Sequence, residues 1–541
     1  GTGGWPSVLA PPHAQAPIAP RPCHPIHRSP GNLARSLNMT DESVRITERA
    51  NELTDDIDVA DSVGICRMMR ACDGQMYSGY KHYASLADSE VRRTMEECSA
   101  LAAECIAAPH ESAVILSGAG TSGRLAFMIA RKFNQLLSRH GRKPCFHYLL
   151  AGGDAALFQA KELAEDDPHA AVADLTEVLS RCEKQRGKPL SRALLIGITC
   201  GLSATYVGAQ IEYALAQPSF AVALVGFNPV HLARKTKVEL WPTSFHEVAL
   251  QLQRLSDSAP LEERRHFVIT PVVGPEAITG STRLKGGTAT KVIIEAVISH
   301  AAARVLQQPY LGGPPPPSLN TERSLAPAEA DSLDSAPPSP DGGVQRRAAA
   351  ARAGLQAYTV SDAVDACEAA CRAVYGEEEA LSRVVEMAAE ALVARRRIYY
   401  LGAGGGGIVG LIDASEQVPT FGADPRDVQG FVVGGWGALH DGCVRPPAGR
   451  LAGVGEALPT VGAEHLLSTP LAKATSSDLL VLIHTPQGGD ALPPEVIAEV
   501  GKVKQRCGIQ LAMVQVSPRE HDRFLCVDFE GSAPLAGAAA E

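Results

Sequence analysis

The sequence predicts an α/β protein built from two tandem, doubly wound parallel sheets, each flanked by helices. Two observations carry this prediction. Uninterrupted apolar runs of strand length alternate with helix-compatible segments. An apolar run followed by a glycine-rich turn also occurs twice, about 280 residues apart, which indicates an internal repeat. Continuous apolar strands are typical of sheets covered on both faces, and 541 residues suffice for several domains.

Each half is expected to open its sheet with a strand and a small-residue turn. These are residues 113–116 with 117–124 in the first half, and 398–401 with 402–408 in the second. Residues 41–110 are expected to be helical, and helical patterning returns near Asp362. The other expected strands share a continuous apolar character and are 145–150, 193–198, 221–227, 267–269, 479–483 and 511–514.

Two segments are expected to lie outside the folded domains. Residues 1–40 are rich in Pro, Ala and His and are predicted to be disordered. Residues 312–350 contain two proline clusters and are predicted to be a linker or an insertion. The expected domains are therefore 41–311 and 351–541.

Composition narrows the function classes. The formal net charge is −10 and aromatic residues make up 5%, which disfavours a nucleic-acid partner. The 13 cysteines are scattered without a paired framework or zinc-ligand spacing, so reduced thiols are expected and neither a metal nor another cofactor is predicted. No apolar run has membrane-spanning length, so no membrane partner is predicted.

The first candidate site is the turn Gly118-Ala-Gly-Thr-Ser-Gly-Arg124. It stands between a strand and a helix start, where backbone N–H groups and the Thr121 and Ser122 hydroxyls converge on an anion. The turn lacks the lysine of a P-loop and does not fit the dinucleotide spacing, so it favours a phosphorylated small molecule over a nucleotide. A tight turn without any ligand is the alternative.

Other polar segments are candidates for the same edge. Thr199-Cys-Gly-Leu-Ser203 directly follows a strand, and ligands of open parallel sheets bind beyond the carboxyl ends of the strands. In residues 274–287, Arg283 and Lys285 supply charge that either braces the ligand edge or serves a structural role. The acidic run 164–167 is either a solvated face or an acceptor for sugar hydroxyls.

The second half offers a carboxylate, in Asp413-Ala-Ser-Glu416, shortly after its glycine-rich turn. A glutamate in such a place can perform general acid/base chemistry or bind hydroxyl groups. The spacing does not choose between these roles and a surface carboxylate.

These motifs together resemble the sugar isomerase (SIS) domain family, which has a doubly wound parallel α/β fold. The segments 118–124, 152–154, 164–167 and 274–291 resemble bacterial N-acetylmuramic acid 6-phosphate etherases. The two SIS-like halves, with Phe133-Asn-Gln-Leu136, Val225-Gly-Phe-Asn-Pro-Val230 and Thr420-Phe-Gly-Ala-Asp424, resemble the animal glucokinase regulatory proteins. The resemblance runs from about residue 46 to 530 and is interrupted by 312–350.

The resemblance implies a regulator rather than an enzyme. Glucokinase regulatory proteins inhibit glucokinase and retain it in the nucleus, so a nuclear and cytoplasmic location is implied. Fructose 6-phosphate strengthens the inhibition, and fructose 1-phosphate relieves it at the same site. Thr121 and Ser122 would bind phosphate, and Glu165 would contact the sugar. The full implied site comprises Gly120, Thr121, Ser122, Gly123, Arg124, Glu165, Thr199, Cys200, Gly201, Ser203, Arg283 and Glu416.

Departures from the etherases refine this hypothesis. In an etherase, a stretch resembling 413–416 follows the phosphate loop of the same domain, and its Glu acts as acid/base. The first half of this chain has Lys132 there, while the second half keeps Glu416 but has Gly404-Gly-Gly-Gly in place of the phosphate grip. One composite site per chain is therefore expected, with Glu416 reaching the ligand from the second half. An etherase-like lyase is the alternative, and a sugar-phosphate isomerase is disfavoured because the matching loops contain no His.

One further departure concerns the C-terminus. Members of the family carry a helical lid after the second SIS domain, with a Lys that reaches the ligand. This chain ends where the lid would begin, so the 351–541 domain is expected to be truncated before it.

Overall fold

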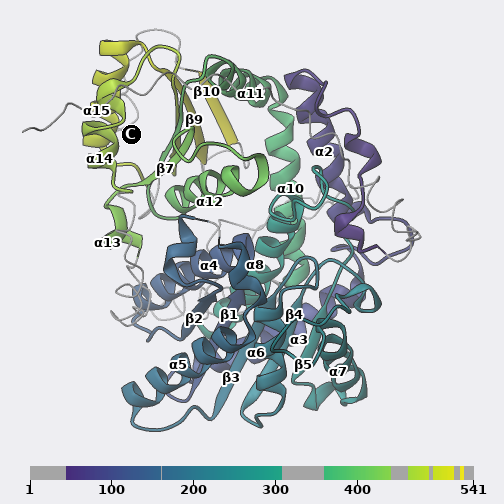
Figure 1. Ribbon diagram of the computed structural model, residues 1–541. Helices are drawn as coiled ribbons and strands as arrows, with labels where there is room; N and C mark the ends of the chain where they lie inside the picture. The colour runs from purple at the N-terminus through teal and green to yellow at the C-terminus, as the bar shows by residue number, and fades with distance from the viewer. Residues whose placement is uncertain are drawn as a thin grey trace, which may run out of the picture.

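Two five-stranded sheets organise the chain, and each belongs to one half of the molecule (Figure 1). The computed structural model describes residues 44–159, 161–306, 359–439, 461–485, 491–516 and 524–528. The predictions for 1–40 and 312–350 lie outside the described residues, and so does the region after 528.

The first sheet is parallel throughout and has the order β2-β1-β3-β4-β5. Its strands are β1 (Ser112–Gly118), β2 (Phe146–Leu150), β3 (Arg192–Ile198), β4 (Phe220–Val225) and β5 (His266–Ile269). Each coincides with a predicted apolar run. The chain reverses its winding direction between β1 and β3, and such a switch point opens a crevice at the carboxyl ends of the two strands.

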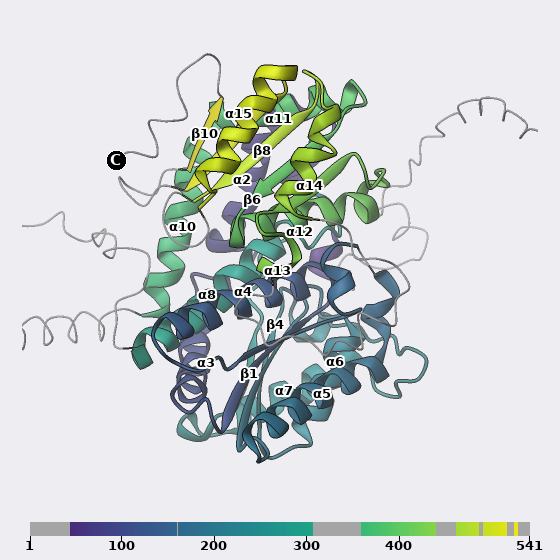
Figure 2. The ribbon, with the colours of Figure 1, turned by 90° about the vertical axis from the view of Figure 1, so that its left-hand side faces the viewer.

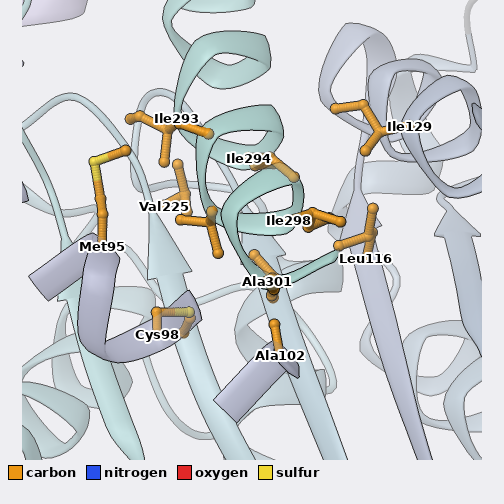
Figure 3. Close-up of a cluster of buried hydrophobic side chains, with 14 of the residues drawn as sticks. Met95, Cys98, Ala102, Leu116, Ile129, Val225, Ile293, Ile294, Ile298 and Ala301 are labelled. Carbon is orange, nitrogen blue, oxygen red and sulfur yellow. The ribbon is translucent and has the colours of Figure 1, made fainter. Parts of the chain in front are cut away.

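Helices cover both faces of this sheet (Figure 2). One face packs against α3 (Ser89–Ala107), α4 (Gly120–Arg139) and α8 (Lys285–Leu306), and the other against α5 (Pro168–Arg186), α6 (Thr205–Leu215) and α7 (Phe245–Ser258). Figure 3 shows part of the first of these cores, to which α3 contributes Met95, β1 contributes Leu116 and α8 contributes Ile298. All three side chains are fully buried, so apolar burial fixes α8 across the sheet.

The second sheet repeats the strand order of the first, as β10-β9-β8-β6-β7. Its strands are β6 (Ile398–Gly402), β7 (Val428–Val432), β8 (Leu479–His484), β9 (Gln510–Val516) and β10 (Phe524–Asp528). Strands β7 and β10 are not among the predicted ones, and β7 is short with Gln429 and Gly430 inside it. The predicted parallel arrangement is confirmed for β6 to β9, and the edge strand β10 departs from it by pairing with β9 antiparallel.

The second sheet also has helices on both faces. Its core faces α14 (Ala463–Ser468) and α15 (Pro494–Cys507) on one side, and α11 (Glu378–Val393) with part of α12 (Gly404–Phe421) on the other. The short α13 (Gly435–Leu439) follows β7. The 3₁₀ turns are η2 (Ile46–Glu48), η3 (Glu52–Thr54), η4 (Asp154–Leu157), η5 (Glu162–Asp166), η6 (Val230–Leu232), η7 (Leu261–Glu263) and η8 (Leu471–Lys473).

The two halves share an apolar interface that is centred on α4 and α12. Leu125 and Met128 on α4 cluster with Ile408 and Leu411 on α12, while Phe133 on α4 packs into the first core. Figures 1 and 2 both place α4 between the first sheet and the second half. The carboxyl edge of the first sheet therefore lies beside α12.

N-terminal and central helices tie the halves together as well. The predicted N-terminal helices are present as α2 (Ser62–Ser78) and α3, and helix α10 (Val360–Gly376) confirms the pattern near Asp362. Asp73 of α2 accepts a 2.6 Å hydrogen bond from Tyr375 of α10. Arg67 of α2 donates to both carboxylate oxygens of Glu378 on α11. A helix from the start of the chain thus braces the second half.

Candidate functional site

The two glycine-rich turns have the same backbone geometry, which confirms the internal repeat. Gly120 and Gly404 occupy equivalent positions with φ of +51° and +48°, a region that favours glycine. A Cβ on Gly123 would lie 2.5 Å from the carbonyl oxygen of Gly118, and one on Gly407 would lie 2.7 Å from that of Gly402. The first turn of each helix therefore packs directly against the last residue of its strand. Only glycine permits this approach, because any Cβ would clash with the strand backbone.

The N-terminus of α4 has no side-chain cap. Its N-cap residue is Ala119, whereas Asp88 caps α3 and Ser244 caps α7 through a capping box. The first N–H groups of a helix have no partner within the helix, and they favour an anion. Ala119 leaves these donors at the carboxyl end of β1, beside the topological switch point, where a bound phosphate would satisfy them.

The second predicted loop meets the first at this edge. Ser122 Oγ lies 3.6 Å from Cys200 Sγ, and both residues are buried. The Thr199 hydroxyl oxygen accepts hydrogen bonds from the backbone N–H groups of Ser203 (3.2 Å) and Ala204 (3.4 Å) and so shapes the loop. Burial raises the pKa of the Cys200 thiol to about 11, so it stays a neutral thiol at physiological pH.

Glu416 of the second half reaches the first anion loop. Its Oε1 atom accepts a 3.0 Å hydrogen bond from the Thr121 hydroxyl and pairs with the Arg124 guanidinium. The Glu416 side chain is 14% exposed and that of Arg124 is 0% exposed, so this ion pair is largely removed from water. The grip of one half and the carboxylate of the other thus meet in one composite site.

Arg283 reinforces this junction from the first half. Its Nη1 donates a 2.9 Å hydrogen bond to the backbone carbonyl of Glu416 and another to the Thr420 hydroxyl. The same atom lies 3.9 Å from Glu416 Oε2, and the guanidinium stacks over the Phe421 ring. Arg283 thus ties α12 to the first half beside Glu416, and its role toward a ligand stays a prediction.

Lys285 has the structural role instead. It is fully buried, and its Nζ donates to the carbonyl of Cys72 and to Gln75 Oε1 on α2. Its backbone N–H and that of Gly286 donate 2.9 Å hydrogen bonds to the Glu276 carboxylate. The Glu276 carboxyl group thus accepts the first N–H groups of α8 from within the chain, in contrast to the uncapped α4.

The buried Glu276 gives a prediction about pH. Burial raises its pKa to about 7 from an ordinary 4.5, so between these values the folded protein holds a proton that the unfolded chain releases. Stability should therefore fall as pH rises from 5 to 8, by about 2–3 kcal/mol from this group. Glu276→Gln should flatten the profile in urea unfolding, with the exposed Glu464→Gln as control. Parallel profiles for wild type and Glu276→Gln would contradict this prediction.

Glu165 is held differently from the other predicted residues. It lies exposed on η5, beside Asp166, which accepts hydrogen bonds from Thr205 (2.8 Å) and Arg234 (2.6 Å). Burial by itself would raise the pKa of Asp166. The two hydrogen bonds lower it by more than burial raises it, so the pKa lies below its ordinary value. Asp166 anchors η5 to the start of α6, and the sugar contact of Glu165 stays a prediction.

Lys132, at the first-half position equivalent to Glu416, does not provide a carboxylate. Its Nζ lies 3.1 Å from Glu295 Oε2, which also accepts a 2.9 Å hydrogen bond from Lys291. The position that holds an acid in the second half thus holds a paired base in the first.

Sequence reasoning missed one cation near the second loop. Arg45 precedes η2, and its Nη1 lies 3.8 Å from where a Cβ on Gly201 would stand. This nitrogen is buried without a hydrogen-bond partner among the described residues. No local signal marks Arg45, because only packing of the N-terminal segment, through the 2.9 Å hydrogen bond from Asn228 to Thr47, brings it to the loop.

Two searches of the described residues complete the survey. Within them, no cluster of His, Cys, Asp and Glu side chains has a metal-binding arrangement. No helix in the same part of the chain combines the length and apolarity needed to cross a membrane.

Family comparisons agree with the tandem architecture. The model of the glucokinase regulatory protein N-terminal SIS domain matches residues 97–215, and that of the second SIS domain matches 375–445. The N-acetylmuramic acid 6-phosphate etherase of Edwardsiella ictaluri is 30% identical over 269 residues, covering 50% of this chain and 72% of the etherase. The chain belongs to the SIS-domain family of glucokinase regulatory proteins and N-acetylmuramic acid 6-phosphate etherases.

Within this SIS-domain family, similarity to the regulatory proteins extends over both halves. The glucokinase regulatory protein of Xenopus laevis is 31% identical over 450 residues, and the human protein is 30% identical over 454. These matches cover 82% and 83% of this chain, which spans 62% and 63% of the two relatives. A solved Escherichia coli tagatose-6-phosphate ketose/aldose isomerase aligns over 86% of this chain and 83% of its own with a TM-score of 0.41 at 11% identity, which carries no functional argument.

Proposed function

We propose that this protein senses fructose phosphates and inhibits glucokinase, that fructose 6-phosphate strengthens the inhibition, and that fructose 1-phosphate relieves it. The observation that carries the proposal is the contact of Glu416 with Thr121 and Arg124 across the two halves. It supports a single site per chain, with the anion grip in one half and a hydroxyl-binding carboxylate in the other. Similarity to glucokinase regulatory proteins over both halves supports the regulatory role.

The site offers a physical route from ligand to partner. A ligand at the junction of α4 and α12 contacts both halves, so it changes the free energy of their relative arrangement. Two ligands that prefer different arrangements shift the population in opposite directions. We further propose that the protein acts in the nucleus and the cytoplasm, a proposal that rests on its similarity to glucokinase regulatory proteins alone.

The test is glucokinase activity against increasing concentrations of this protein. Inhibition that fructose 6-phosphate deepens and fructose 1-phosphate reverses is the expected result. Ser122→Ala should remove the response to both ligands, because Ser122 lies at the centre of the anion loop. The matched control is Ser256→Ala, because Ser256 is also a buried serine but lies on α7. This variant should respond to both ligands as wild type does. Absence of inhibition at micromolar protein would refute the regulatory role.

An etherase-like lyase is the second candidate. It is favoured by the 30% identity to etherases and by a carboxylate, Glu416, beside the anion grip. It is disfavoured by Lys132, because the first half lacks the acid/base that follows the phosphate loop in etherases. Release of lactate from N-acetylmuramic acid 6-phosphate would support the lyase, and wild-type release that survives Glu416→Gln would exclude Glu416 as its acid/base.

A further inference from the structure

Glu416 engages two donors of the first anion loop that are predicted to hold a phosphate group. Its Oε1 atom lies 3.0 Å from the Thr121 hydroxyl and is paired with Arg124, and both groups belong to the predicted phosphate grip. Arg283 faces the other oxygen, Oε2, at 3.9 Å. The carboxylate thus takes up donors that an incoming phosphate needs.

Arg124 is also equipped to hold a further anionic group. Its side chain is fully buried, its Nε donates a 2.8 Å hydrogen bond to the carbonyl of Ala156, and its Nη1 pairs with Glu416. Its Nη2 atom is buried with no hydrogen-bond partner among the described residues. A buried guanidinium N–H without an acceptor is costly, so this donor indicates a ligand oxygen that is not supplied by the chain.

We propose that Glu416 is a selectivity determinant that makes this site favour sugar phosphates over inorganic phosphate. A bare phosphate must displace or repel the carboxylate and offers it few donors in return. A sugar phosphate brings hydroxyl groups that donate to the displaced carboxylate, so the buried charge keeps its hydrogen bonds. The inference rests on the proposed function, because it presumes a sugar phosphate at this loop.

The carboxylate acts in this way because it arrives from the other half of the chain. Glu416 lies on α12, whose carbonyl at the same residue and whose Thr420 hydroxyl are held by Arg283. These contacts hold the backbone of α12 beside the loop, so the proposal requires only the Glu416 side chain to change partners when a ligand enters. The site discriminates between inorganic phosphate and a sugar phosphate because only the sugar phosphate offers hydroxyl groups to the Glu416 carboxylate.

The test is calorimetric titration of wild type and Glu416→Gln with inorganic phosphate and, separately, with fructose 6-phosphate. The amide keeps the side-chain shape and one acceptor but removes the charge. We expect phosphate to bind about tenfold tighter or better to the variant, and fructose 6-phosphate to bind equally or more weakly. Asp424→Asn removes an exposed charge just beyond the same helix and should leave both affinities at wild-type values.

Other outcomes would overturn the inference. If Glu416→Gln binds both inorganic phosphate and fructose 6-phosphate more weakly, the carboxylate is a structural or purely attractive group. If the affinity for inorganic phosphate is unchanged, the carboxylate does not compete with phosphate. Glu416→Ala serves as the second variant if the amide does not fold, with the same expected gain for phosphate. If wild type binds no fructose phosphate while the variant gains phosphate, the proposed function fails and the competition stands. If no protein binds either anion, both fail.

Discussion

Replacing Gly123 with alanine should collapse the first anion loop and abolish sugar-phosphate binding. A Cβ there would lie 2.3 Å from Leu150 Cδ1 and 2.5 Å from the Gly118 carbonyl oxygen. The Leu150 side chain can rotate away, but Gly118 ends β1, so the backbone of that strand or the start of α4 would have to move. Glycine to alanine within a helix ordinarily stabilises by about 1 kcal/mol, but overpacking here should cost about 3 kcal/mol.

The measurement is urea unfolding together with titration of fructose 6-phosphate. Gly120→Ala, three residues earlier in the same loop, is the matched control. It meets nothing within 4 Å but has a φ of +51°, so only backbone strain of about 1–2 kcal/mol is expected. Equal stability of Gly123→Ala and wild type would contradict the prediction, because it would show that the backbone around the loop shifts to accept the methyl group at no cost.

Replacing Arg124 with methionine should weaken fructose 6-phosphate binding about a hundredfold or more. Arg124 is fully buried beneath the loop and supplies charge to the grip. Losing charge-assisted hydrogen bonds of about 1.5–3 kcal/mol each accounts for a loss of that size. The change also removes the closest cation of the largely buried Glu416 and leaves Arg283 at 3.9 Å, which should destabilise the protein by about 1–3 kcal/mol.

A double-mutant cycle separates these effects. Combined with Glu416→Gln, Arg124→Met should cost less stability than the sum of the two single changes, because no unpaired buried charge remains. Arg131→Met is the matched control, since Arg131 is also buried on α4 and donates to the Ala438 carbonyl across the junction. It should leave ligand affinity within a few-fold of wild type. Strictly additive stabilities in the cycle would contradict direct pairing of Arg124 with Glu416.

The sequence by itself determined the local structure around the first anion loop and the tandem fold. The strand at β1 follows from four consecutive apolar residues, and the turn after it follows from glycines whose missing Cβ atoms permit close approach. These features depend on neighbours in the chain, so periodicity and sterics reveal them. The position of the second loop directly after a strand predicted that it lies at the same edge as the first, and the Ser122–Cys200 contact brings the two loops together. By contrast, Gln429 and Gly430 interrupt the apolar run of β7, so the sequence pattern did not predict that strand.

Only the tertiary structure decided which charged groups face the site and which are buried elsewhere. Arg283 and Lys285 lie two residues apart, yet the first holds α12 while the second is buried against α2. Arg45 reaches the second loop from a segment with no motif, and β10 reverses its direction at the edge of its sheet. The physical reason is that burial, desolvation and ion pairing depend on residues distant in sequence, which packing alone brings together. Glu416 was expected at the site only through the family resemblance, and its contacts with Thr121 and Arg124 exist only once α12 docks on α4.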